Sequence, residues 1–93
     1  MTYPLEPVDA RSVRLQPGDR VRVVGIPDLS SIPEPDELGT REVFQHLVGT
    51  YRRIAGFDEL GHVRLDFRIR KGPHSGRHTV WIEPYLLRRR VRD

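Results

Sequence analysis

The side chains that could perform catalysis do not form a recognisable catalytic pattern. Ser30 and Ser31 lie in a proline-rich stretch with neither a nucleophile elbow nor a nearby lysine base. Asp58 and Glu59 are adjacent carboxylates in a predicted turn, where they serve solvation and turn geometry rather than acid–base catalysis. The chain has no cysteine for thiol chemistry and no glycine-rich phosphate loop. We therefore predict no catalytic residues and no enzymatic activity.

Histidines and clustered carboxylates are the candidates for metal binding. His74 and His78 flank a predicted loop tip, and without cysteine only His62 or a carboxylate could complete a site around them. Residues 34–37 supply three carboxylates, which hard cations such as calcium prefer, but two prolines and the missing ligand spacing disfavour a calcium loop. Solvated side chains are the default interpretation, so we predict no metal site and no cofactor. The residue types alone do not exclude a metal at either place.

A basic and aromatic outer surface is the strongest candidate for function. Arginines alternate with apolar residues along the predicted strands, so their side chains face outward beside two aromatic residues. The predicted partner-binding residues are Arg52, Arg64, Arg68, Arg70, Lys71, Arg77, Trp81 and Tyr85. Aromatic stacking combined with arginines binds single-stranded nucleic acid, and the same pairing is typical of protein interfaces. Asp66 and Glu83 interrupt the basic set and favour a protein partner of mixed charge.

Charge is distributed unevenly along the chain. Residues 1–50 carry a net charge of −3 and residues 51–93 a net charge of +6. A basic half can indicate an anionic partner such as nucleic acid or an acidic protein. Fifteen of the sixteen basic residues are arginine, which is also an ordinary residue of solvated strand faces, so both interpretations stay open.

Strict alternation of apolar and polar residues predicts the strands that position these side chains. The longest alternation runs over residues 62–70. Its inward residues are Val63, Leu65, Phe67 and Ile69. Residues 20–23 alternate in the same way after a Pro17-Gly18 turn, and residues 79–83 form a further strand with Trp81 outward.

Two features break this alternation. Tyr51 and Ile54 are three residues apart, whereas inward residues of a plain strand are two apart, so we predict a β-bulge over residues 50–54 that turns both inward. Pro84 interrupts the next ladder, and residues 85–87 form a tight turn before a last short strand.

Loops and one short helix complete the predicted elements. Residues 27–39 form a long proline-rich loop, after which Thr40 caps a helix over residues 41–48. The apolar face of this helix consists of Val43, Phe44, Leu47 and Val48. Turns are expected over residues 56–61 and 71–77.

Length and composition limit the chain to one small domain. Its 93 residues provide one core, and no stretch approaches the ~20 apolar residues of a membrane span. We expect no signal peptide, and the lack of cysteine favours the cytoplasm. Four or five short strands with one helix predict an all-β fold, a small barrel. We divide the chain into a flexible N-terminal arm (1–14), the barrel (15–88) and a basic C-terminal tail (89–93).

The order of these signals resembles a known group of barrels. The stretches are PGDRVRV at 17–23, VGTYRRI at 48–54 and TVWIEPYLL at 79–87. They resemble the SH3-like barrels of electron-transport accessory proteins. That group includes the C-terminal domain of the nitrile hydratase β subunit, the small PsaE-type subunit of photosystem I and the ferredoxin–thioredoxin reductase variable chain.

The nitrile hydratase likeness is closest and covers roughly residues 15–88. It is carried by Gly18-Asp19-Arg20-Val21-Arg22-Val23, by Val48-Gly49-Thr50, and by Val80, Ile82, Glu83 and Tyr85-Leu86. The resemblance implies an SH3-like barrel of about five strands with a docking or accessory role beside a larger protein. It implies no activity, because the catalytic metal of those hydratases is held by cysteines of the other subunit. The helical N-terminal part of that β subunit is missing here.

Two functions follow as hypotheses. The first is a non-catalytic accessory or protein-binding module that docks on a larger enzyme or complex, as a monomer or as part of a hetero-complex. Trp81, Tyr85 and the outward arginines would form its contact surface, and the loop over residues 27–39 would give selectivity. The alternative is a small RNA- or DNA-binding barrel that uses the basic, aromatic outer face. No membrane partner is expected.

Overall fold

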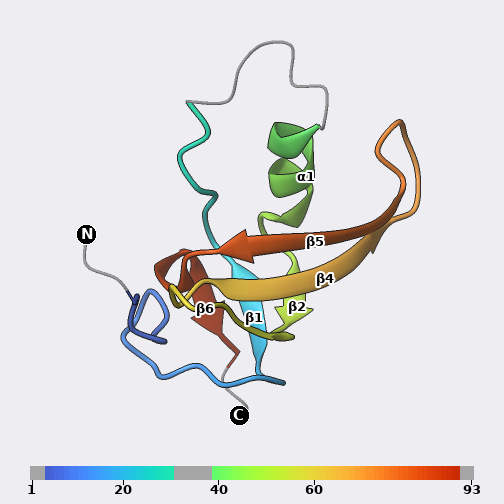
Figure 1. Cartoon of the computed structure of the whole chain (residues 1–93). Helices are drawn as coiled ribbons and strands as arrows, with labels where there is room; N and C mark the ends of the chain where they lie inside the picture. The colour runs from blue at the N-terminus through green and yellow to red at the C-terminus, as the bar shows by residue number, and fades with distance from the viewer. Residues whose placement is uncertain (1–3, 31–38, 91–93) are drawn as a thin grey trace.

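The strands of the described residues form two small antiparallel sheets. The computed structural model describes residues 4–30 and 39–90 (Figure 1). Its elements are β1 (Arg20–Val23), α1 (Thr40–Leu47), β2 (Tyr51–Arg53), β3 (Gly56–Phe57), β4 (Val63–Ile69), β5 (Gly76–Ile82), the 3-10 turn η1 (Pro84–Leu86) and β6 (Leu87–Arg89). One sheet has the strand order β2-β1-β6 and the other β3-β4-β5. This confirms the prediction of a mainly β fold with one short helix after the first strand.

The longest strand alternates as predicted. The buried residues of β4 are Val63, Leu65, Phe67 and Ile69. β5 pairs with β4 from Ile82 opposite Val63 to Gly76 opposite Ile69. β5 therefore begins at Gly76, inside the predicted loop over residues 71–77. The long β4 provides backbone partners for residues 76–78, which precede the predicted strand over residues 79–83.

The turn that precedes β1 has the predicted geometry. Gly18 has φ of +88°, and the backbone N–H of Asp19 donates to the carbonyl oxygen of Gln16 at 3.1 Å. A positive φ at the third position of a turn is the type II arrangement, which favours glycine there. β1 then starts at Arg20 with Val21 and Val23 fully buried.

The predicted β-bulge over residues 50–54 is wrong. β2 pairs with β1 without interruption, and Tyr51 lies opposite Arg22 with 46% of its surface exposed. Ile54 is 2% exposed but follows the end of β2, where its N–H donates to the carbonyl oxygen of Asp19 at 2.9 Å. The spacing of three residues arises because Tyr51 faces outward, whereas Arg52 and Ile54, two residues apart, lie on the core side as the alternation requires.

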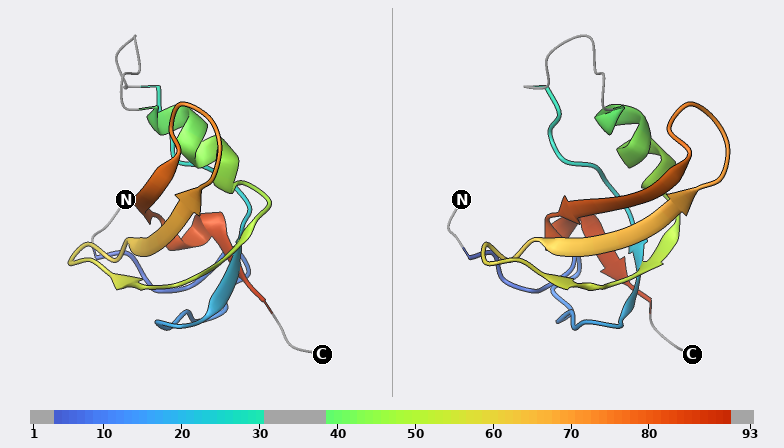
Figure 2. Two further views of the ribbon diagram at one scale, coloured as in Figure 1. Left: turned by 90° about the vertical axis from the view of Figure 1, so that its right-hand side faces the viewer. Right: turned by 45° about the vertical axis from the view of Figure 1, so that its right-hand side comes forward.

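Helix α1 stands at one end of the sheets, beside the loop that joins β4 and β5 (Figure 2). The residues that it adds to the single core are Val43, Phe44 and Leu47. Val48, predicted on the same face, is 44% exposed because the helix ends at Leu47. The predicted Thr40 cap is also wrong, since Gly39 occupies the N-cap position with φ of +66°. No helix in the described ranges is long and apolar enough to cross a membrane.

The predicted turn over residues 56–61 includes a short strand, β3, that pairs with β4. Beyond it, Oδ1 of Asp58 accepts hydrogen bonds from the N–H groups of Leu60 (3.0 Å) and His62 (2.7 Å). Desolvation raises the pKa of the Asp58 carboxyl, but the contacts with His62 and Leu60 outweigh it and hold the pKa below its ordinary value. Asp58 thus stabilises a turn, as predicted, and the role predicted for its neighbour Glu59 stays a prediction.

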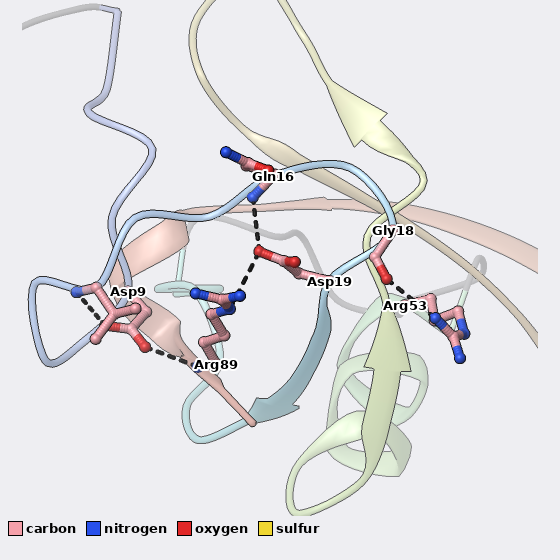
Figure 3. A network of polar contacts seen from close by, with 7 residues as sticks. Asp9, Gln16, Gly18, Asp19, Arg53 and Arg89 are labelled. Atoms are coloured by element: carbon pink, nitrogen blue, oxygen red, sulfur yellow. Dashed lines mark hydrogen bonds and ion pairs between the residues drawn. The ribbon is translucent and has the colours of Figure 1, made fainter. Parts of the chain in front are cut away.

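Asp9 fixes the N-terminal segment to the last strand (Figure 3). Its side chain is 4% exposed. Oδ1 accepts hydrogen bonds from the backbone N–H groups of Arg11 (2.8 Å) and Val13 (2.9 Å), and Oδ2 accepts one from Arg89 (2.7 Å). Burial raises the pKa of the Asp9 carboxyl, but the N–H groups of Arg89, Val13 and Arg11 outweigh burial and lower this pKa below 3.8.

Further backbone hydrogen bonds join the ends of the described chain to the strands. The N–H of Ala10 donates to the carbonyl oxygen of Leu87, and the N–H of Arg90 donates to that of Arg20, both at 2.8 Å. The second bond continues the pairing of β6 with β1 by one residue. The division into an arm (1–14), a barrel (15–88) and a tail (89–93) stays a prediction.

We expect Asp9→Asn to lower the free energy of unfolding by about 1–3 kcal/mol, because an amide nitrogen cannot accept the hydrogen bond of a buried N–H. The folded pKa of Asp9 is lowered, so its stabilisation is present above pH 3.8 and is lost as the pH falls through the folded pKa. Urea unfolding at neutral pH and at acid pH measures both effects. The exposed Glu6→Gln is the matched control in the same segment, and equal losses in the two variants would contradict this assignment.

Candidate functional site

The outer face of the β2-β1-β6 sheet carries a group of arginines. Val21 and Val23 of β1 are buried, so Arg20 and Arg22 project from the opposite face. Antiparallel pairing places further side chains beside them in two rows across the sheet. One row is Arg53, Arg20 and Arg90, and the other is Tyr51, Arg22 and Arg88. We call these six residues the arginine face.

Tyr51 is the aromatic residue of the arginine face. The guanidinium carbons of Arg20 and Arg90 lie 5.6 Å and 5.7 Å from its ring centroid. Tyr51 comes from β2 and Arg90 follows β6, so these side chains approach each other across β1. Cation–π contacts at exposed sites contribute about 0.5–1 kcal/mol each, which holds the ring in place on the face.

The charge of the arginine face is not neutralised by carboxylates among the described residues. None of its five arginines forms an ion pair there, and Arg53 donates instead to the carbonyl oxygen of Gly18 at 3.1 Å. The neighbouring Asp19 pairs instead with Nε of Arg89 at 3.4 Å (Figure 3).

A surface hollow opens beside Tyr51. Its volume is about 360 Å³, and its lining residues are Arg11, Arg22, Tyr51, Arg88, Arg89 and Arg90. Clustered guanidinium groups offer forked N–H donors that match phosphate and carboxylate oxygens. The hollow therefore has the chemistry of an anion site with one aromatic wall.

Four of the sequence-predicted residues meet on the other sheet, on the outer face of β4 and β5. Arg64 lies opposite Trp81, and Arg68 lies opposite Arg77. Asp66 stands between these pairs and binds Arg64 through two hydrogen bonds, of 2.9 Å and 3.2 Å.

The Arg64–Asp66 contact makes this second face a surface of mixed charge. The hydrogen bonds from Arg64 and from the Thr79 hydroxyl (2.8 Å) hold the pKa of the Asp66 carboxyl below its ordinary value. The same contact raises the pKa of Arg64. Both groups therefore stay charged at neutral pH, and the carboxylate cancels one of the four positive charges that the sequence predicts along β4 and its loop.

Arg52 does not belong to an outward basic set, which corrects the prediction. It lies opposite Val21 and turns toward the core side, where its guanidinium carbon is 5.3 Å from the ring centroid of Phe67. Its Nε donates to the Thr50 hydroxyl at 3.2 Å. Because Tyr51 faces outward rather than inward, Tyr51 and Arg52 have the orientation opposite to the predicted one, whereas Arg53 faces outward.

The remaining predicted residues lie elsewhere on the surface. Arg70 and Lys71 are exposed in the loop between β4 and β5. Tyr85 is 46% exposed on η1, the turn that connects the two sheets. Tyr85 therefore belongs to the strand pairing of neither sheet.

The loop histidines are engaged by protein groups. Nε2 of His74 lies 3.1 Å from Oε2 of Glu42 on α1. Nε2 of His78 donates to the carbonyl oxygen of His74 at 2.6 Å, and the His78 ring stacks on Phe67 with centroids 5.6 Å apart. His62 contacts Asp58 at 3.1 Å. Over residues 4–30 and 39–90, no group of three histidine, cysteine or acidic side chains could hold a metal ion.

The other chemical candidates fall at the edge of the described residues. The backbone N–H of Ser30 donates to Oδ1 of Asp28 at 3.0 Å, an ordinary turn contact. Ser31 and the carboxylates of residues 34–37 lie outside the described residues.

Comparison of this chain with protein-family models, with curated proteins and with solved structures finds no match. The resemblance to the accessory-protein barrels therefore stays a prediction.

Sequence reasoning missed the arginine face, although each strand carries a sign of it. The segments RVRV, YRR and LRRR occur at 20–23, 51–53 and 87–90. The alternation in β1 identifies Arg20 and Arg22 as outward. Only the strand order β2-β1-β6 brings the other segments next to them.

We expect Trp81→Ala to change the free energy of unfolding by less than about 1 kcal/mol, because Trp81 is 45% exposed and packs only across the strand pair. Its neighbour Ile82 is fully buried, so Ile82→Ala should cost about 2–5 kcal/mol. Thermal or urea unfolding of both variants measures the difference. A larger loss for Trp81→Ala than for Ile82→Ala would reverse the assigned phase of β5.

Proposed function

We propose that this chain is a non-catalytic nucleic-acid-binding protein that holds the phosphate backbone on its arginine face. One observation carries the proposal: five arginines share one sheet face, and none of the five has an ion pair among the described residues. Neighbouring strands are about 4.8 Å apart, so these guanidinium groups create a strong local positive potential. A polyanion that replaces small counterions on this face gains free energy from their release.

Nucleic acid fits this face better than an acidic protein does. Protein interfaces place arginine among apolar residues and charges of both signs. The arginine face instead combines a uniform charge with one exposed aromatic ring, Tyr51, which matches a phosphate backbone with bases attached.

We further propose the SH3-like barrel as the architecture of the chain. Two three-stranded antiparallel sheets around one core, with a short helix in the connection after β1, support it. Small barrels of this kind can bind a strand on an outer sheet face without any catalytic group.

We expect the double variant Arg22→Gln, Arg88→Gln to weaken binding to single-stranded RNA and DNA. For single strands, the slope of log K against log salt concentration changes by about 0.7 for each phosphate contact. The double variant should therefore reduce this slope by about 1.4. Fluorescence anisotropy between about 50 and 200 mM salt measures the slope.

The matched control is Arg64→Gln, Arg68→Gln, which removes the same charge from the other sheet. We expect this control to keep the wild-type salt slope. Equal losses in the two double variants would show that binding follows net charge alone and would contradict the proposal. The absence of micromolar binding at about 50 mM salt would also overturn it.

A protein-docking role is the second candidate, favoured by the mixed-charge face of β4 and β5. Trp81 is 45% exposed there beside the Arg64–Asp66 pair. Tryptophan and arginine are the residues that most often dominate binding energy at protein interfaces. A larger enzyme or complex could use this face while the arginine face stays accessible on the other sheet.

We expect a tagged pull-down after nuclease treatment to retain a defined partner protein if this second role holds. Trp81→Ala should then abolish retention, because it removes the exposed ring, whereas Arg22→Gln, Arg88→Gln should preserve it. Mass spectrometry identifies the retained protein. Retention that Trp81→Ala leaves intact, or that nuclease removes, contradicts docking through this face.

A further inference from the structure

We infer that the arginine face binds single-stranded nucleic acid, with one base stacked on Tyr51 and the adjoining phosphates on Arg22 and Arg88; this inference rests on the proposed function. The observation behind it is the juxtaposition of an exposed aromatic ring and guanidinium groups around one hollow. The inference specifies which form of nucleic acid binds and which side chain contacts a base.

The hollow beside Tyr51 has the size and chemistry for one nucleotide unit. Its volume of about 360 Å³ lies at the lower end of the range of small-molecule sites. Tyr51 and five arginines line it. A base needs a flat apolar surface and a phosphate needs forked N–H donors, and both are present within one hollow.

Tyr51 is held in a position that favours stacking. Its backbone is fixed by the pairing of β2 with β1, opposite Arg22. The guanidinium groups of Arg20 and Arg90 restrain the ring through their contacts at 5.6 Å and 5.7 Å. Planar guanidinium groups also stack on bases, so Arg20 and Arg90 can contact a base that comes to lie on the Tyr51 ring.

The shape of the arginine face favours a single strand over a duplex. The face spans two strand gaps, about 10 Å, and two residues along each strand, about 7 Å. A groove-reading protein inserts a helix or a β-ribbon into the duplex. Here α1 stands at the end of the molecule opposite the C-terminal end of β6 (Figures 1 and 2), so no helix of the described residues lies beside the face. In a duplex, paired and stacked bases could not lie on the Tyr51 ring.

The stacking contact is tested with an oligothymidylate of about ten nucleotides, an abasic strand of the same length and a matched duplex. Tyr51→Leu should weaken oligothymidylate binding between about fivefold and a hundredfold, the range measured for one base–aromatic stack. It should leave binding of the abasic strand unchanged. Tyr51→Phe keeps the ring and should bind as the wild type does. Circular dichroism melts of each variant verify folding. We expect the variants to fold, because Tyr51 is exposed and lies outside the core.

The outcomes separate this inference from the proposed function. If Tyr51→Leu binds oligothymidylate as tightly as the wild type, or if wild type prefers the duplex, the stacking inference is overturned. The proposed function would still stand wherever Arg22→Gln, Arg88→Gln lowers the salt slope. If wild type binds neither the strand nor the duplex, the proposed function itself fails. Should Tyr51→Leu unfold, Tyr51→Phe compared with Tyr51→His repeats the test with two planar rings of different stacking surface.

Discussion

Burial of the two valines of β1 is the constraint on which the rest of the structure depends. Val21 and Val23 are fully buried, and burying a side chain of this kind contributes about 1.5–3 kcal/mol. Because a strand has a period of two, their burial forces Arg20 and Arg22 onto the outer face. Two unit charges about 5 Å apart in water repel by about 0.8 kcal/mol, and salt reduces this further. Core packing therefore outweighs the repulsion, and the array of like charges persists as long as the core does.

The arginine face also depends on contacts between distant parts of the chain. Arg88 and Arg90 reach it only because β6 pairs with β1, and Asp9 holds the backbone of β6 at Arg89. The Asp9 carboxylate accepts its hydrogen bonds from backbone N–H groups, so it adds order without neutralising a guanidinium of the face. Asp19 is occupied in a comparable way by Arg89 and by the N–H of Gln16. The carboxylates nearest to the face are thus used for structure, which leaves its positive charge available to a ligand.

The sequence pattern predicted the orientation of side chains correctly in the long strand and wrongly in a short one. The alternation over residues 62–70 predicted β4 and its inward residues, because seven paired residues give a clear period. β2 has three residues, too few to define a phase, and counting the aromatic Tyr51 as a core residue led to an inverted assignment of Tyr51 and Arg52. The arginine face could not be predicted from local pattern, since β1 and β6 are far apart in the chain and their pairing is decided by packing. The stacking of His78 on Phe67 was not predicted either, because β5 pairs with β4 from Gly76 onward, whereas the sequence pattern predicted a strand only from residue 79.

The two outer sheet faces show how position, rather than composition, sets the character of a basic surface. On β4 a carboxylate lies two residues from an arginine, so Asp66 and Arg64 share a face and form an ion pair there. On β1 the residues two apart are both arginines, and their cross-strand neighbours are arginines and a tyrosine. One face therefore presents paired charges beside Trp81, and the other presents charges around Tyr51 that have no ion pair within residues 4–30 and 39–90. A phosphate backbone would have to displace Asp66 from Arg64 to bind the first face, whereas no arginine of the second face is ion-paired with a carboxylate of the described residues. The charged surface of β4 and β5 is accordingly better suited to a partner that carries charges of both signs.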